Sequence, residues 1–197
     1  MGQVSRRTLL TRAGIGTGAG VFALLGTTAA PAFGAASITD LSNVRLVCVA
    51  KRIAINWDTQ WVNTPAAVAD DNAADVIRAV RVQEQGHYKT LAPLLGATAP
   101  TDDDYTFTFP KGALRSPQAA AQFAVDLESM MVGLVVGAAA RTVDPDAAAA
   151  LASIVAGDGQ HLSALSVLAG GTSIVDGFPA ALDIVDAGNQ LAPFISN

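Results

Sequence analysis

The chain has 197 residues, of which 51% are hydrophobic and only 6% aromatic, so it can form one domain with an ample core. The prevalence of alanine favours close-packed helices over a sandwich of β-branched strands. The net charge of -5 comes from 17 acidic and 12 basic residues, and no run of Lys or Arg could follow a phosphate backbone, which argues against a nucleic-acid partner.

Residues 1–36 have the three regions of an export signal in order. Paired Arg6 and Arg7 precede a weakly apolar, Gly-rich stretch that ends in small residues. The stretch from Ser5 to Leu10 resembles a twin-arginine signal, although Leu9 stands where Phe is commoner. A cytoplasmic N-terminal helix is the alternative interpretation.

Cleavage is expected near residues 34–36, which would leave residues 37–197 as one mature domain. The twin-arginine pathway implies export in a folded state, to the cell envelope, the periplasm or the extracellular space. The longest later apolar run, residues 130–140, is too short to span a bilayer, so we expect a soluble mature protein without a transmembrane segment. The only cysteine, Cys48, cannot form an internal disulfide and is expected to be buried and inert.

Apolar residues at helical spacing, together with start and stop signals, predict four long helices. Ser116-Pro117 and Asp144-Pro145 each supply an N-capping side chain followed by a proline at the first helical position, and Gly170-Gly171 ends the last long helix. A short fifth helix in the tail, residues 176–197, is expected to cover one end of the bundle. The four long helices are expected at residues 38–62, 70–93, 116–141 and 144–169.

The predicted connections are short, long and short. The long one, "LLGATAPTDDDYTFTFPKGALR", follows the second helix and is too long for a tight turn between neighbours. This order is typical of two helical hairpins joined by one crossover, the arrangement of ferritin-like four-helix bundles. Trp57 and Trp61 are expected to pack against the crossover, and its acidic stretch, residues 101–105, is expected to be a solvated loop.

The second and fourth helices end in similar patterns, "EQGHYKTLAPLLG" and "DGQHLSALSVLAGG". Glu84 precedes His87 by three residues and Asp158 precedes His161 by three, so each pair shares one helix face and can meet the same cation. Dinuclear iron or manganese sites in this kind of bundle also use a Glu from each remaining helix, and the third helix offers Glu128. The chain has no other Glu or His, so each of these residues falls where such a site would use it.

These segments carry a family resemblance. From about Ser37 to Phe194 the chain resembles the exported bacterial ferritin-like domain proteins, through "VQEQGHYKTLAPLLG", "AVDLESMMVGLVVGAAA", "TVDPDAAAALASIVAGDGQHLSAL", the twin-arginine signal and the closing "LAPFI". The resemblance implies an all-α, ferritin-like four-helix bundle whose ancestral site binds two metal ions.

The chain departs from that family at the site. The first helix carries Lys51 where the family has a Glu, judged by the aromatic Trp57 six residues later. A protonated Lys cannot be a ligand and is repelled by metal charge. The fourth helix supplies Asp158 in place of Glu, flanked by Gly157 and Gly159, each of which costs about 1 kcal/mol in a helix interior. The sequence therefore predicts a weakened site.

Two functions stay open from the sequence. The favoured one is an exported, non-catalytic structural or binding module whose centre is metal-free or weakly metal-binding, with Lys51 as the neutralising cation. The alternative is an iron or manganese oxidoreductase, or an iron-handling protein, with a dinuclear centre. Catalytic residues and a protein partner are not defined by the sequence, and a homodimer is compatible with it. The candidate metal ligands are Glu84, His87, Glu128, Asp158 and His161.

Gly133 and Gly137, four residues apart in the third helix, have two interpretations. They predict a close helix-helix contact, because small residues let two backbones approach, or they are simply tolerated in an Ala-rich core.

Overall fold

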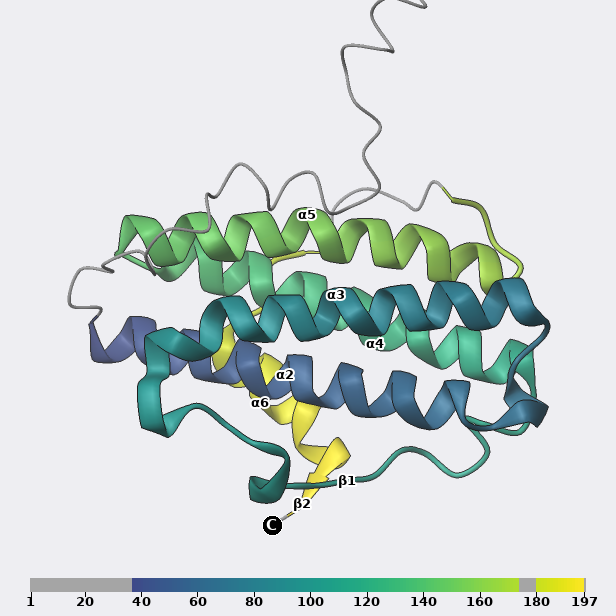
Figure 1. Ribbon diagram of the computed structural model, residues 1–197. Coiled ribbons are helices and arrows are strands. Elements are labelled where there is room, and N and C mark those ends of the chain that lie inside the picture. The colour runs from purple at the N-terminus through teal and green to yellow at the C-terminus, as the bar shows by residue number, and fades with distance from the viewer. Residues whose placement is uncertain (1–36, 174–179, 197) are drawn as a thin grey trace, which may run out of the picture. The chain divides into compact units, whose positions relative to one another are not determined.

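The computed structural model describes residues 37–173 and 180–196 (Figure 1). The predicted export signal and its cleavage site lie outside the described residues. Within them, four long helices form two antiparallel hairpins, which confirms the predicted all-α bundle. The long helices are α2 (Ile38–Val62), α3 (Asp71–Leu95), α4 (Pro117–Arg141) and α5 (Pro145–Leu168).

Each long helix begins at a residue whose side chain caps it. The side-chain oxygens of Ser37, Asp70, Ser116 and Asp144 each accept a hydrogen bond from the backbone amide three residues later. Such a cap stabilises a helix by about 0.5–2 kcal/mol, which explains why these polar residues mark the boundaries so clearly in the sequence.

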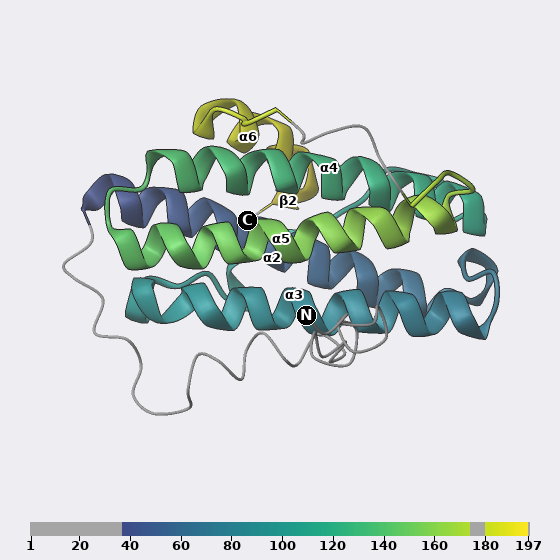
Figure 2. The ribbon, with the colours of Figure 1, turned by 90° about the horizontal axis from the view of Figure 1, so that it is seen from above.

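The helices pack in a ring in which α2 contacts α3 and α4, and α5 contacts α4 and α3 (Figure 2). The crossover from α3 to α4 runs back along the bundle, as predicted (Figure 1). Short elements punctuate the connections and the tail: the 3-10 helices η2 (Pro65–Ala67), η3 (Gly96–Thr98), η4 (Asp102–Asp104) and η5 (Ala192–Phe194), and the strands β1 (Thr106–Phe107) and β2 (Ile195–Ser196).

Strands β1 and β2 pair antiparallel and so join the crossover to the C-terminal tail. Beneath them, Trp57 of α2 contacts Phe109 of the crossover in an edge-to-face arrangement, with ring centroids 5.1 Å apart. Phe123 and Phe194 complete the aromatic cluster. The predicted packing against the crossover is therefore confirmed for Trp57. Trp61 donates its indole N–H to the Ala67 carbonyl at 2.8 Å, in the connection between α2 and α3.

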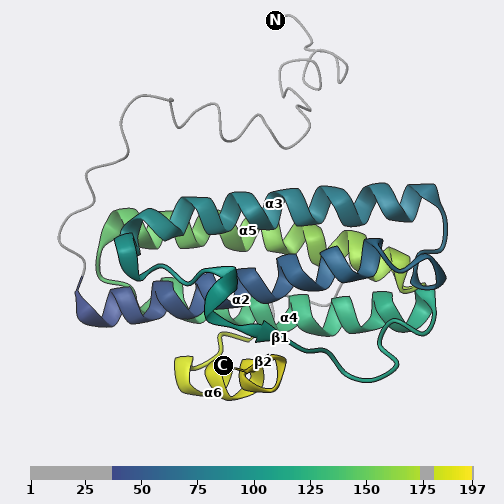
Figure 3. The same ribbon diagram turned by 60° about the horizontal axis from the view of Figure 1, so that its bottom comes forward.

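The short tail helix is α6 (Ile184–Leu191). It packs against α4 and α2, along the side of the bundle (Figures 2 and 3). The prediction of a short helix is therefore confirmed, but its predicted place at an end of the bundle is wrong. The side chains of Ala187 and Leu191 are the buried ones of this helix.

Gly133 and Gly137 do form a close contact, but with the extended tail segment before α6 and not with another helix. The Leu182 amide donates to the Gly133 carbonyl at 2.9 Å. A Cβ atom at position 133 would stand 2.8 Å from the Ala180 carbonyl oxygen, and one at position 137 would overlap the Leu182 carbonyl. Glycine at both positions lets the tail lie directly on the backbone of α4.

Among the described helices, only α4 is long and apolar enough to cross a membrane by length and composition. Its position explains that composition, because α2, α5, α6 and the tail segment pack against it. The part of α4 that these elements cover is apolar, whereas its exposed face carries Gln118, Gln122 and Asp126. Cys48, on the neighbouring α2, is fully buried as predicted, and burial raises the pKa of its thiol to about 12.

Candidate metal centre

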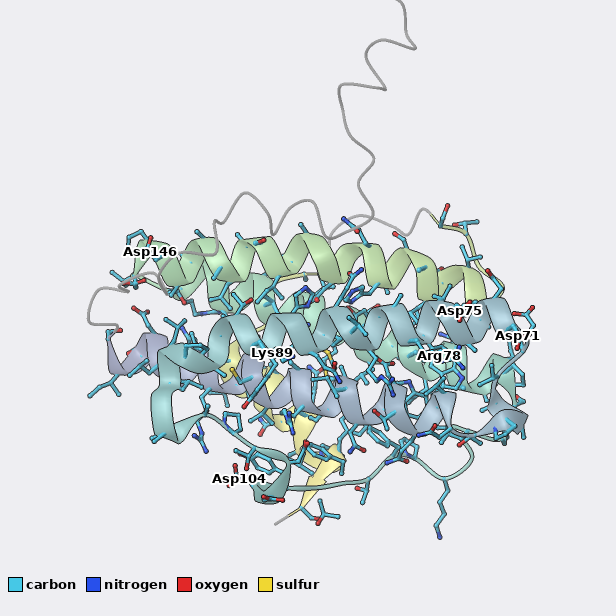
Figure 4. All side chains as sticks on the ribbon, in the orientation of Figure 1. Asp71, Asp75, Arg78, Lys89, Asp104 and Asp146 are labelled. Atoms are coloured by element: carbon cyan, nitrogen blue, oxygen red, sulfur yellow. The ribbon has the colours of Figure 1, made fainter. Side chains whose placement is uncertain are left out.

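The middle of the bundle contains a cluster of charged side chains from all four long helices. Their exposed fractions are between 0% and 5%, whereas the labelled surface charges of Figure 4, such as Asp71, Asp75 and Arg78, are exposed. The structure thus brings together every residue that the sequence assigned to the site. We call these six residues the central cluster: Lys51 from α2, Glu84 and His87 from α3, Glu128 from α4, and Asp158 and His161 from α5.

Lys51 lies between the acids of α3 and α5. Its Nζ is 2.6 Å from Asp158 Oδ2 and 3.0 Å from Glu84 Oε2, and all three side chains are completely buried. Burial alone would lower the pKa of the Lys51 ammonium, but the charges of Asp158 and Glu84 reverse this and raise it above its usual range. Lys51 is therefore a fixed cation in contact with the two acids of the repeated pattern.

The two imidazoles lie side by side on the other side of these acids, with ring centroids 5.5 Å apart. His87 Nδ1 is 3.1 Å from Asp158 Oδ1, and His161 Nδ1 is 3.1 Å from Glu84 Oε1 and 3.3 Å from Glu128 Oε1. Each histidine therefore points Nδ1 at the acid of the opposite helix.

Gln83 is a site residue that the sequence analysis missed. Its Oε1 lies 2.8 Å from His161 Nε2 and accepts a hydrogen bond from that nitrogen, so His161 Nδ1 is held toward the acids. The corresponding position of the other hairpin is Gly157, and a Cβ atom there would stand 2.8 Å from His87 Nε2. The sequence did contain a signal for Gln83, because it lies four residues before His87 and therefore on the same face of α3.

Asp58 is the second residue that was missed as part of the site. It lies two helical turns after Lys51 on α2 and is 3% exposed. Burial, and then the charges of Glu84 and Glu128, raise the pKa of its carboxyl well above the usual value, while Arg81 opposes the shift. The helical spacing of seven residues from Lys51 was the available signal.

The pKa values of the two glutamates in the central cluster are shifted in opposite directions. Burial would raise the pKa of Glu84, but Lys51 and the contacts with the two histidines hold it well below the usual value. Glu128 has no contact with Lys51, and burial together with the charges of Glu84 and Asp158 raises its pKa to about 7. Burial would lower the pKa of His161, but its contacts with Glu128 and Glu84 raise it to about 10.

This geometry could hold a metal ion. Glu84, His87, Asp158 and His161 each offer one ligand atom, and these four atoms lie within 4.8 Å of one another. Two ions do not fit the residues, because the helix that should supply the remaining carboxylate supplies the Lys51 ammonium, which already contacts both shared acids.

Two helical hairpins, a long crossover and a buried carboxylate and histidine cluster at mid-bundle define a four-helix bundle of the ferritin-like class. A family model described as the ferritin-like domain matches residues 24–171, well over half of the chain. The chain belongs to this family. No curated protein and no solved structure matches it in the comparisons made.

Proposed function

We propose that this chain is an exported ferritin-like protein that acts as a non-catalytic structural or binding module of the cell envelope. The observation that supports the proposal is the position of Lys51, whose Nζ contacts the two acids that a dinuclear centre would share between its metal ions. An internal ammonium that is held there removes the need for one of the two ions.

The alternative is a dinuclear iron or manganese oxidoreductase or iron-handling protein. It is favoured by the two histidines, each of which directs Nδ1 at the acid of the other hairpin. Bound metal would supply redox chemistry there, and Glu84, His87, Glu128, Asp158 and His161 would be its ligands. The contacts of Lys51 count against a second ion, and therefore against this alternative.

Iron oxidation separates the two functions. When ferrous iron is added in air, the purified protein is expected to consume oxygen no faster than the buffer alone, and Glu84→Ala is expected to make no difference. Oxygen uptake is measured with an electrode, and iron per chain is measured by atomic spectroscopy after gel filtration. Faster uptake with two irons per chain, both lost in Glu84→Ala, would establish the oxidoreductase.

Export rests on residues 1–36 alone. Replacement of Arg6 and Arg7 by lysine together is expected to leave the protein in the cytoplasm, because the twin-arginine pathway requires the arginine pair. Cell fractionation and immunoblotting follow the protein, and Arg12→Lys, outside the pair, is the matched control. Unchanged export of the double variant would contradict the proposed pathway.

A further inference from the structure

Glu84, His87, Asp158 and His161 each offer one ligand atom, and these four atoms lie within 4.8 Å of one another. His87 Nδ1 is 3.1 Å from Asp158 Oδ1, which is 3.9 Å from His161 Nδ1. His161 Nδ1 is 3.1 Å from Glu84 Oε1, and Glu84 Oε2 is 3.8 Å from His87 Nδ1. Four ligands at the usual distances of about 2.0–2.2 Å from a tetrahedral ion stand about 3.3–3.6 Å apart. The contacts between neighbouring atoms are close to this value, and the wider separations, up to 4.8 Å, would contract when an ion binds.

Three of these atoms have no hydrogen-bond partner in the part of the chain that the structure describes. They are His87 Nδ1, Asp158 Oδ1 and Glu84 Oε2, and all three side chains are more than nine-tenths buried. Glu84 Oε2 contacts the Lys51 ammonium, whereas His87 Nδ1 and Asp158 Oδ1 approach each other closely without the geometry of a hydrogen bond. Burying polar atoms in this way is unfavourable, and a cation that both atoms contact would satisfy both.

The charges of the central cluster fit a single divalent ion. Glu84, Glu128 and Asp158 contribute three negative charges, and Lys51 contributes one positive charge. One divalent ion would make the cluster neutral, whereas two would leave an excess of buried positive charge, which is unfavourable in a bundle interior. The fourth acid nearby, Asp58, adds no negative charge to this sum, because burial favours its protonated form.

The ligand chemistry indicates the class of ion. Two imidazoles with two carboxylates suit zinc and related transition metals, whereas magnesium and calcium require oxygen ligands. Gln83 accepts from His161 Nε2, so Nδ1 is the nitrogen that faces the acids, as is usual when an outer partner orients a metal-binding histidine. All four ligands are buried side chains, a closed arrangement that is typical of structural sites.

We propose that the centre binds one divalent transition-metal ion through His87, His161, Glu84 and Asp158, and that Lys51 takes the place of a second ion. The ion joins α3 to α5, and its role is structural. The inference rests on the proposed function, in that it assigns a structural ligand to a non-catalytic module.

The test is a metal titration of the purified protein after it has been stripped with EDTA. Co²⁺ and Zn²⁺ are each expected to bind at one ion per chain, with the intense visible spectrum of four-coordinate cobalt and an increase in melting temperature. Mg²⁺ is expected to produce neither. Lys51→Glu is expected to bind two ions per chain, because the added carboxylate completes the second position and restores neutrality.

Variants identify the ligands. Gln83→Ala leaves every ligand in place and is expected to weaken Co²⁺ binding by about 10–100-fold, the usual effect of losing an outer partner. His161→Ala and His87→Ala are expected to weaken it further, with helical content checked by circular dichroism. Gln160→Ala, on the exposed face beside His161, is the matched control and is expected to bind normally.

The outcomes separate this inference from the proposed function. If the wild-type protein binds no Co²⁺ or Zn²⁺, or if His161→Ala and Gln83→Ala bind as tightly as wild type, the inference is overturned while the non-catalytic module stands. Two ions per wild-type chain would overturn both, because Lys51 would then not replace an ion.

Discussion

Lys51→Met is expected to lower the free energy of unfolding by about 3–5 kcal/mol at neutral pH without metal, because it leaves buried carboxylates without their cation. Methionine retains most of the length of the side chain, being shorter only by the terminal nitrogen, so packing is little changed and the loss reports the charge. Glu84 and Asp158 both contact the ammonium and are completely buried, so neither has water to replace it. Urea denaturation followed by circular dichroism, in buffer with EDTA, measures the effect.

Lys89→Met is the matched control, because Lys89 is exposed on α3 (Figure 4). Surface substitutions of this kind usually change stability by no more than about 0.5 kcal/mol. Removing both acids in the Lys51→Met background, with Glu84→Gln and Asp158→Asn, is expected to restore much of the loss. A Lys51→Met protein as stable as the control would show that the ammonium does not neutralise the acids.

The metal-free protein is expected to lose stability steadily as the pH is raised to about 10. The pKa of His161 is raised from an ordinary value of 6.5 to about 10, so its contribution is complete below pH 6.5 and is lost as the pH rises through the folded value. The pKa of Glu128 is raised from 4.5 to about 7. Between these pH values the folded protein holds a proton that the unfolded protein has lost, so the free energy of unfolding falls as the pH rises.

Glu84 acts in the opposite direction. Its pKa is lowered well below 4.5, so its contribution is present above pH 4.5 and is lost as the pH falls through the folded value. The greatest stability is therefore expected near pH 4.5, with a decline above it that continues to about pH 10. Urea midpoints in EDTA at intervals from below pH 4.5 to about pH 10 give the profile, and His161→Asn is expected to flatten its alkaline side. A wild-type profile without a decline above pH 6.5 would contradict these protonation states.

The sequence predicted the four long helices well because their ends carry local chemistry. Ser116-Pro117 and Asp144-Pro145 define a helix start within a few residues, and the structure starts α4 and α5 at those prolines. The central cluster was predictable for a related reason. Three-residue spacing fixes two side chains on one helix face, and the two hairpins repeat that spacing at Glu84 and Asp158.

Contacts between distant segments were harder to predict. The tail helix α6 was expected at an end of the bundle because nothing in residues 184–191 indicates which surface they meet. Gly133 and Gly137 signal close approach, but a missing Cβ does not specify whether a helix or an extended chain approaches. Gln83 and Asp58 were missed because their roles depend on how α2, α3 and α5 are rotated about their axes.

The claim on which this account depends is that the Lys51 ammonium lies where a ferritin-like centre would bind one of its two ions. A crystal structure of the protein grown with zinc, with anomalous data collected at the zinc edge, tests it most directly. The account predicts Lys51 Nζ in contact with Glu84 and Asp158 and no more than one anomalous peak, placed between His87 and His161. Two peaks in the central cluster, with the Lys51 side chain turned away from both acids, would contradict it.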